Sequence, residues 1–312
     1  MKRTRKVKGI WPETVRHSVI PRIGKAEDIE FWFESNFKGG FPVVVSSGRA
    51  AIGLISRFVQ PLSNIELFPF ASQCVVNAFM LNGVTPNSSL VSSKIPKMIY
   101  HQWGYSARAE ISTALIEDSV DSFFPIGSNV RRADARFEIW SLSKILGLRV
   151  GAIIWCKNQN DATELRILIG NSSLLSTANK SFFRFSSRSR SKTLYRLWEK
   201  MECLNPRLMP WELGHIFTWV QKWEEIYLAR KNRILNAAQS GENYESIFYN
   251  DYSLETGDIL ILPSVLILKS ENLKDINLTE STNSMRFSLH CITYRDSFQG
   301  IRKVEIIPTH LI

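Results

Sequence analysis

Short apolar runs rich in β-branched residues alternate with helical segments through the first half of the chain. Residues 41–46 form such a run, and residues 50–59 follow it with apolar side chains on one helical face. Further strand candidates cover residues 98–102, 114–118 and 137–140. This alternation is typical of a largely parallel sheet covered by helices. We therefore predict an α/β fold with three layers, α/β/α, around a mainly parallel sheet.

The pattern changes after about residue 205, where the alternation of strands and helices stops. The sequence predicts one long amphipathic helix over residues 211–238. Residues 258–262 and 285–290 then alternate apolar and polar side chains, as strands do. We therefore predict a large domain over residues 1–205 and a smaller C-terminal α+β domain over residues 206–312.

The formal net charge of +10 favours partners that carry phosphate groups. The excess lies in the N-terminal tail, residues 1–8, and in residues 180–192, where basic residues alternate with Ser and Phe. Some proteins that bind single-stranded nucleic acid have segments of this composition. No nucleic-acid motif accompanies the charge, so we favour a solvated loop for residues 180–192. An anionic small substrate, such as a nucleotide conjugate, is the second interpretation.

The four cysteines and five histidines are widely spaced and form neither a Cys-x-x-Cys pair nor a metal-ligand pattern. We therefore expect no metal site and no disulfide framework. The sequence has no apolar run long enough to span a bilayer, and the basic tail lacks the apolar stretch of a secretory signal. These features favour a cytoplasmic protein.

Two strand ends in the first half carry residues suited to binding a ligand. Ser46-Ser47-Gly48-Arg49-Ala50 joins a strand to a helix, where backbone N–H groups and the helix dipole favour an anion. Asp118 ends a second apolar strand, at the sheet edge where ligands gather in open α/β folds. Taken singly, the first motif also fits a plain strand-to-helix turn, and the second fits a turn cap.

Lys144 follows a third strand, in the run Ser141-Leu142-Ser143-Lys144. A lysine at a strand end, beside hydroxyl groups, is a typical anchor for pyridoxal 5′-phosphate (PLP), because its amine forms a Schiff base while its neighbours hold phosphate. A solvated loop lysine is the alternative. The order of the three motifs, anion turn, acidic strand end and lysine strand end, favours the cofactor lysine.

These residues resemble the fold-type-I PLP enzymes, and most closely the DegT/DnrJ/EryC1/StrS family of sugar aminotransferases. Ser47-Gly48-Arg49-Ala50-Ala51 is similar to the family's phosphate turn, and residues 68–78 are similar to its following helix entry. Residues 116–122 resemble the acidic strand end, and the run that ends at Lys144 resembles the Schiff-base segment. The resemblance is specific over about residues 40–156.

The resemblance implies roles for individual residues. Lys144 would form the Schiff base with PLP and move protons, and Asp118 would hold the pyridine nitrogen of the cofactor. The other implied cofactor contacts are Ser47, Gly48, Arg49 and Ser141 at the phosphate, and Gln73 near the face of the ring.

The chain departs from the family's usual pattern in two places. Residues 83–98 are shorter than the matching segment, where the family has a strand and a helix beside the substrate pocket. Asp121 stands where the family commonly has His or Gln near the cofactor, and a second carboxylate beside Asp118 would raise the pKa of one of them. These departures keep open the alternative of a PLP-fold protein that has lost transamination and serves as a binding or regulatory subunit.

The activity that the resemblance implies is transamination of a keto-sugar. An amino donor, glutamate in this family, would load the cofactor, which would then aminate a keto-sugar carried on a nucleotide, often for surface polysaccharide. Sites of this family are usually completed by a second subunit, so the resemblance also implies a homodimer. A basic protein associated with nucleic acid is the remaining alternative.

Overall fold

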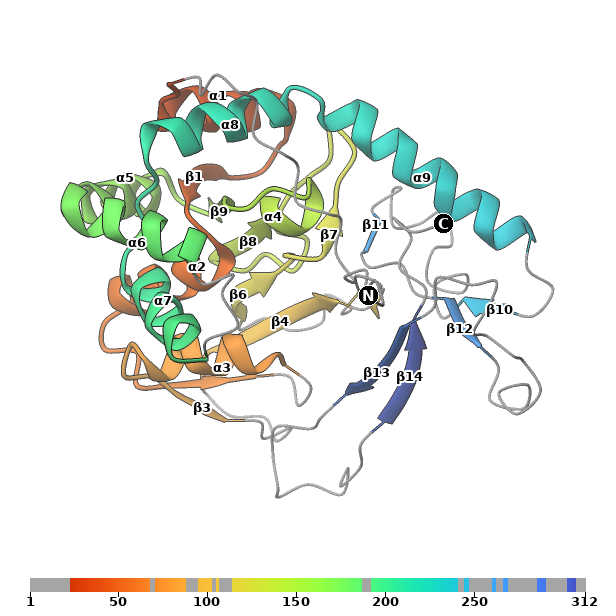
Figure 1. Ribbon diagram of the computed structural model, residues 1–312, viewed down its shortest axis with the longest axis horizontal. Coiled ribbons are helices and arrows are strands. Elements are labelled where there is room, and N and C mark those ends of the chain that lie inside the picture. The colour runs from red at the N-terminus through yellow and green to blue at the C-terminus, as the bar shows by residue number, and fades with distance from the viewer. Residues whose placement is uncertain are drawn as a thin grey trace, which may run out of the picture.

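The protein is seen in a computed structural model, in which helices surround a large sheet (Figure 1). Some of the segments discussed above, namely residues 1–8, 68–70, 88–94 and 187–191, lie outside the described residues. The structure describes residues 23–67, 71–87, 95–102, 105–106, 114–186, 192–240, 244–246, 260–261, 266–268, 285–289 and 302–306.

The chain enters the sheet through the strand, turn and helix that the sequence predicts. Helix α1 (Ala26–Asn36) leads into strand β1 (Phe41–Val45), and helix α2 (Gly48–Phe58) follows. Ser47 is the N-cap of α2, because its hydroxyl accepts a hydrogen bond from the backbone N–H of Ala50 at 3.2 Å. The first turn of α2 is therefore capped by a residue of its own sequence.

The main sheet has the strand order β1-β9-β8-β6-β4-β2-β3, and β5 pairs with β4. Strand β9 runs antiparallel to both of its neighbours, β1 and β8, whereas the pairs from β8 to β3 are parallel. The mainly parallel sheet predicted from the sequence is confirmed. Its remaining strands are β2 (Asn64–Glu66), β3 (Thr85–Asn87), β4 (Lys97–Gln102), β5 (Tyr105–Ser106), β6 (Ala114–Asp118), β8 (Phe137–Ser141) and β9 (Ala152–Cys156).

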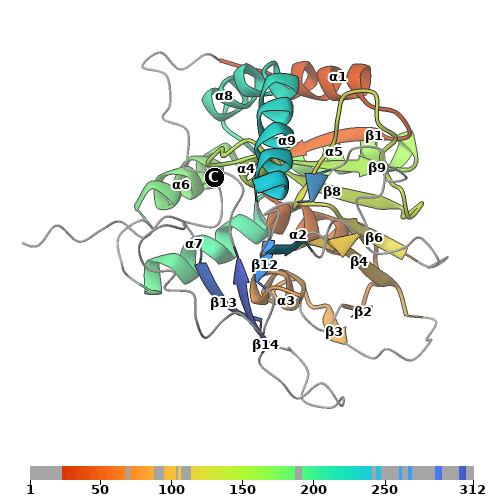
Figure 2. The ribbon, with the colours of Figure 1, turned by 90° about the vertical axis from the view of Figure 1, so that its right-hand side faces the viewer.

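Successive side chains of the central strands pack on opposite faces of the sheet, as the pleat requires. In β9, Ile154 belongs to a cluster with α2, α3 (Gln73–Met80) and α5 (Gln159–Gly170). Its neighbours Ile153 and Trp155 belong to a second cluster, which includes α1. The sheet is therefore the middle of three layers, as predicted (Figure 2).

Strand β1 lies at one edge of the sheet, and two charged side chains cover that edge. Glu30 of α1 accepts a hydrogen bond from the backbone N–H of Val44 at 2.9 Å. Arg166 of α5 donates to the carbonyl of Pro42 at 2.9 Å and pairs with Glu30 at 2.8 Å. These contacts satisfy backbone groups of β1 that have no strand beside them.

The single helix predicted over residues 211–238 is wrong in one respect, because the structure has two helices there. These are α8 (Pro210–Val220) and α9 (Trp223–Ser240). At the break, the backbone N–H of Lys222 donates to Trp219, only three residues back, which tightens the last turn. Neither Gly nor Pro marks the break, and the apolar spacing continues across it, so the sequence carried no signal for it.

The solvated loop predicted over residues 180–192 is also wrong for the residues of that segment that the structure describes, 180–186 and 192. Helix α6 (Leu174–Ser186) contains its first half, and α7 (Lys192–Leu204) begins at its last residue. The side chain of Lys180 is fully buried, and Arg184 pairs with Glu202 and Glu212. Lys180 and Arg184 lie one helical turn apart, so they face inward together.

Short strand pairs make up the described part of the chain after α9. The predicted strands near residues 260 and 287 appear as β11 (Leu260–Ile261), which pairs with β7 (Ser122–Phe123), and β13 (Met285–Leu289). The other strands there are β10 (Tyr244–Ser246), β12 (Leu266–Leu268) and β14 (Arg302–Ile306). Helices α8 and α9 pack against the main sheet. The domain boundary after residue 205 stays a prediction.

A cluster of aromatic rings holds α1 and α9 against the sheet. Trp223 of α9 is fully buried, lies 4.9 Å from Phe123 between ring centroids, and donates its indole N–H to the carbonyl of Phe124 at 2.7 Å. Trp140 of β8 stacks on Phe124 with ring centroids 4.3 Å apart. Large buried rings of this kind contribute much of the stability of a core.

Replacing Trp223 by Ala should therefore destabilise the protein strongly. We expect Trp223→Ala to lower the free energy of unfolding by about 3–5 kcal/mol, measured by urea unfolding, because the change leaves a cavity and an unpaired carbonyl. Leu228→Ala is the matched control on the same helix, since Leu228 is 47% exposed. The control should change the free energy by less than about 0.5 kcal/mol. Equal effects of the two variants would contradict this packing account.

Candidate active site

The strand ends that the sequence singles out meet at one edge of the sheet. Strands β6 and β8 are parallel neighbours, with Asp118 opposite Ile139 in the register. Asp118 ends β6 and Ser141 ends β8, so both lie at the carboxyl edge, where ligands bind in open α/β sheets. Lys144 follows in the short helix α4 (Leu142–Ile145).

Lys144 forms an ion pair with a buried carboxylate. Its Nζ donates to Oδ1 of Asp121 at 2.7 Å. The side chain of Lys144 is 32% exposed, whereas that of Asp121 is 3% exposed, so the amine lies at the border between the interior and solvent. Asp118, also buried, accepts a hydrogen bond from the backbone N–H of Val120 at 3.0 Å. The amine is therefore held above a turn that carries two carboxylates.

The two carboxylates and the amine influence one another's protonation. Burial raises the pKa of Asp118 to about 7, with Asp121 adding to the rise and Lys144 opposing it. Burial also raises the pKa of Asp121, against the opposing effect of Lys144. Burial disfavours the charge on Lys144, but Asp121 and Asp118 together raise the pKa of the amine above its ordinary value. The amine is therefore charged at neutral pH in the protein without cofactor.

The turn at the start of α2 approaches the acidic turn closely. A Cβ added to Gly48 would lie 3.3 Å from Cγ1 of Val120 and 3.8 Å from Cγ2 of Ile139. Val120 stands between Asp118 and Asp121 in the chain. Gly48 thus allows the helix N-terminus, with its backbone N–H groups, to lie against the turn that holds the carboxylates.

The hydroxyl groups beside Lys144 lie together, whereas two other predicted site residues have partners elsewhere. Ser141 and Ser143 share a hydrogen bond of 2.9 Å between their hydroxyl oxygens. Arg49 pairs with Glu199 of α7 at 3.3 Å and stacks on the ring of Trp198. The Gln73 amide donates to the side chain of Asn77 at 2.9 Å, at an exposed position of α3. The roles of these residues toward the cofactor stay predictions.

The sequence reasoning missed Tyr100, which lies beside Asp118, and Cys74, which influences the pKa of Tyr100 and of Lys144. Tyr100 of β4 is buried and stands opposite Asp118 in the parallel register. Burial, with added effects from Asp118 and Cys74 of α3, raises the pKa of Tyr100. Cys74 also raises the pKa of Lys144. Tyr100 could have been found from the sequence, because it lies near the end of a predicted strand, as Asp118 does.

The described residues form neither a metal centre nor a membrane-spanning helix. Among the described residues, no three His, Cys, Asp or Glu side chains gather where they would hold a metal ion. Within the same part of the chain, no helix combines the length and the apolar character needed to cross a membrane.

The comparisons with known proteins identify the class of protein that this fold and site define. The sequence matches, over residues 29–252, the family described as "Putative PLP-dependent aminotransferase". The match covers well over half of the chain, so the protein belongs to this family. No relative is found among curated protein sequences.

Solved structures of aminotransferases have the same fold. DesV from S. venezuelae, in complex with a ketimine intermediate, gives a TM-score of 0.59 at 13% identity, over 92% of this chain and 85% of that chain. A DegT DnrJ EryC1 StrS aminotransferase from Brucella abortus gives 0.55 at 12% identity, over 92% and 86%. The sugar aminotransferase CalS13 from Micromonospora echinospora gives 0.53 at 12% identity, over 80% and 75%. The fold predicted from the resemblance is confirmed.

The cofactor is PLP, and the residues at the sheet edge fit it. PLP needs an amine, a carboxylate for its pyridine nitrogen and donors for its phosphate. Lys144 would supply the amine, and the buried Asp118 would supply the carboxylate. The absence of a side chain at Gly48 brings the N-terminus of α2 against the same turn. The donor set and its spacing in the fold therefore suit this cofactor.

The charge on Asp118 should destabilise the protein without cofactor at neutral pH. An acid with a raised native pKa binds more protons in the native state, so the free energy of unfolding falls as the pH rises from about 4 to about 7. We expect Asp118→Asn to gain stability on the order of 2 kcal/mol at about pH 8, but almost none at about pH 4. Urea unfolding of the cofactor-free protein at both pH values measures this difference.

Asp134→Asn is the control for this prediction. Asp134 is 72% exposed and pairs with Lys157, and that hydrogen bond lowers the pKa of its carboxyl group. Its removal should therefore bring no gain in stability at about pH 8. A gain by Asp118→Asn that is the same at both pH values would contradict the assignment of a buried charge to Asp118.

Proposed function

We propose that the protein transfers an amino group to the keto group of a sugar, with PLP as the carrier of the group. One observation carries the proposal: the Lys144 amine lies 2.7 Å from Asp121 at the sheet edge where β6 delivers the buried Asp118. Membership in a family of PLP-dependent aminotransferases supports the reaction class.

The proposed roles of the side chains follow from their chemistry. Bound PLP withdraws electrons from the carbon that carries the amino group and so makes a proton on that carbon acidic. Lys144 Nζ is the group that removes and returns this proton. Asp118, as a carboxylate, holds a proton on the pyridine nitrogen, and the N-terminus of α2 with Ser47, Gly48 and Ser141 holds the phosphate.

Asp121 has a separate role in this proposal. Its carboxylate accepts a hydrogen bond from Lys144 and favours the charged amine, which is not nucleophilic. Cofactor binding must therefore move a proton away from Lys144 before the amine reacts. The second negative charge also opposes the charge on Asp118, which makes the protonated pyridine nitrogen a favourable partner for this turn.

The substrate part of the proposal rests on similarity and charge. The sugar aminotransferase CalS13 has the same fold. The net charge of +10 suits an acceptor that carries phosphates, so we propose a nucleotide-linked keto-sugar as acceptor and glutamate as donor. A role in surface-polysaccharide or related sugar biosynthesis, a homodimer and a cytoplasmic location complete the proposal and stay predictions.

Lys144→Ala should abolish the covalent attachment of PLP. We expect the wild-type protein to be yellow with PLP and to carry the label on the Lys144 peptide after borohydride reduction. The variant should lose that label and transaminate about a thousandfold more slowly or worse, because it lacks the base. Lys157→Ala, at a lysine that pairs with the exposed Asp134, is the matched control and should keep both properties. A label on another lysine of the wild-type protein would refute the assignment.

One specific observation favours a second candidate function, a PLP-fold protein without transaminase activity. Arg49 of the predicted phosphate turn pairs with Glu199 of α7. The two functions differ in the half-reaction with glutamate. Conversion of the yellow form to pyridoxamine phosphate, followed by its return with a keto-sugar nucleotide, supports the aminotransferase. A yellow protein that glutamate leaves unchanged supports the second function.

A nucleic-acid partner receives less support from the structure than from the sequence. The segment that suggested it places Lys180 in the interior and uses Arg184 to bind Glu202 and Glu212. Lys180 donates to two backbone carbonyls and Arg184 to two buried carboxylates, so neither charge is presented to a phosphate backbone.

A further inference from the structure

Helix α7 binds two residues of the proposed phosphate turn. The hydroxyl of Ser46 donates to Oε1 of Glu202 at 2.7 Å. Arg49 donates to Oε1 of Glu199 at 3.3 Å and stacks on Trp198, 4.4 Å from its ring centroid. Glu199 and Glu202 lie three residues apart on α7, so one face of that helix holds both ends of the turn.

Helix α7 also packs along the length of α2. A Cβ added to Gly53 would overlap the carbonyl oxygen of Cys203, so α2 and the end of α7 are in direct backbone contact. Arg57 donates to that carbonyl at 3.3 Å and to the side chain of Asn82 at 2.8 Å. Arg49, Gly53 and Arg57 are spaced four residues apart and therefore form one stripe of α2 that faces α7.

The chain after α7 adds backbone contacts to Ser46. The N–H of Ser46 donates to the carbonyl of Pro206 at 2.9 Å. From another part of the chain, the N–H of Gly151, just before β9, donates to the carbonyl of Ser46 at 2.7 Å. The hydroxyl of Ser46 also lies 3.4 Å from the carbonyl of Asn205. Ser46 is fully buried and is the residue before the N-cap of α2, so any shift of these partners moves the helix N-terminus.

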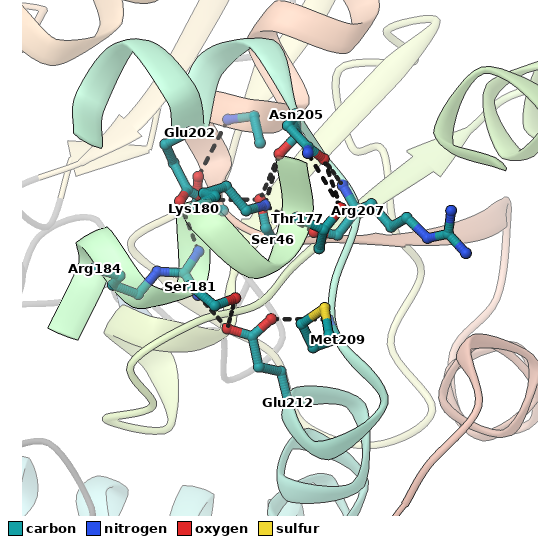
Figure 3. A network of polar contacts seen from close by, with 12 residues as sticks. Ser46, Thr177, Lys180, Ser181, Arg184, Glu202, Asn205, Arg207, Met209 and Glu212 are labelled. Atoms are coloured by element: carbon teal, nitrogen blue, oxygen red, sulfur yellow. Dashed lines mark hydrogen bonds and ion pairs between the residues drawn. The ribbon is translucent and has the colours of Figure 1, made fainter. Parts of the chain in front are cut away.

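Glu202 is itself fixed by buried charges (Figure 3). Arg184 of α6 donates to Oε2 of Glu202 at 2.6 Å and to Oε1 of Glu212 at 2.5 Å. Lys180 donates to the carbonyls of Asn205 and Arg207, each at 2.7 Å. The cluster contains two positive and two negative side chains, so its formal charges balance.

The balance of charges keeps Glu202 ionised. Burial opposes its charge, but Arg184, Lys180 and the Ser46 hydroxyl outweigh burial and hold the pKa of Glu202 well below its usual range. An ionised carboxylate accepts a stronger hydrogen bond than a neutral acceptor does. Burial lowers the pKa of Lys180 to about 8, yet an amine that has lost a proton still donates to the two carbonyls.

We propose that Glu202, through Ser46, and Glu199, through Arg49, are positioning residues that set the geometry of the cofactor-phosphate turn. On this account Arg49 anchors the turn to α7 and does not bind the phosphate. The inference rests on the proposed function in one respect, that residues 46–49 seat the phosphate of PLP. It goes further, because it assigns a role to the α6–α7 segment and its buried charges.

The test compares variants that remove single bonds. Ser46→Ala removes the hydroxyl that binds Glu202, and Glu202→Gln keeps the shape of the side chain but removes its charge. Ser56→Ala is the matched control, because Ser56 is also a fully buried serine, on α2, but its hydroxyl binds the carbonyl of Ile52 within the helix. PLP affinity is measured by titration, and phosphorus NMR of the bound cofactor reports the surroundings of its phosphate. Urea unfolding of the cofactor-free variants monitors the fold.

We expect Ser46→Ala and Glu202→Gln to bind PLP on the order of tenfold more weakly than the wild type and to shift the phosphorus resonance, since a lost charged hydrogen bond weakens positioning by this amount. Ser56→Ala should keep the affinity and the resonance, whatever its stability. If Glu202→Gln does not fold, Ser46→Ala alone decides. Wild-type affinity and an unshifted resonance in folded Ser46→Ala would overturn the inference.

The pair of Arg49 and Glu199 gives an independent test of whether Arg49 anchors the turn or binds the phosphate. If Arg49 is an anchor, Glu199→Gln and Arg49→Gln should weaken PLP binding by similar factors. If Arg49 leaves Glu199 to bind phosphate, Glu199→Gln should leave the affinity unchanged or strengthen it, and the inference is wrong. A wild-type protein without a PLP label on Lys144 would instead refute the proposed function, and this inference would fall with it.

Discussion

The shared direction of β6 and β8 is the constraint on which the rest of the site depends. Because the two strands are parallel neighbours, Asp118 and Ser141 end at the same edge of the sheet. Lys144 follows directly, and the acidic turn after β6 meets its amine. Strand β9, which runs antiparallel, brings the chain back beside β1 and leaves the turn before α2 at this edge as well. Three segments that are distant in the sequence are brought together by strand direction alone.

Two groups of buried charges have opposite consequences in this protein. At the sheet edge, Asp118 and Asp121 share one amine, and burial raises the pKa of both carboxyl groups. This arrangement is unfavourable without a further positive group, which is expected of a site that awaits a ligand. Between α6, α7 and α8, two carboxylates meet two cations, and Glu202 stays ionised. The charges of that group balance one another, so the group fits a structural role.

The sequence was sufficient for the layers and the order of the motifs, because strand and helix periodicities are local properties. Lys144 and Asp118 were predicted as site residues from their positions at strand ends, and their roles stay predictions. The inward direction of Lys180 and Arg184 was not predictable in this way, since it depends on Glu202 and Glu212, which lie further along the chain. The partner of Arg49 was missed for the same reason. The sequence alone does not show whether a basic residue is neutralised by a phosphate or by a buried carboxylate.

The bond between Ser46 and Glu202 joins residues 156 positions apart in the chain. During synthesis, β1 and the start of α2 leave the ribosome long before α7 exists. If α7 sets this turn, the turn can reach its final geometry only when the chain has been made as far as residue 207, whose carbonyl binds Lys180. On the positioning account, the protein can bind the cofactor only after α7 has been synthesised. A shorter nascent chain contains the phosphate motif but lacks the residues that fix its geometry.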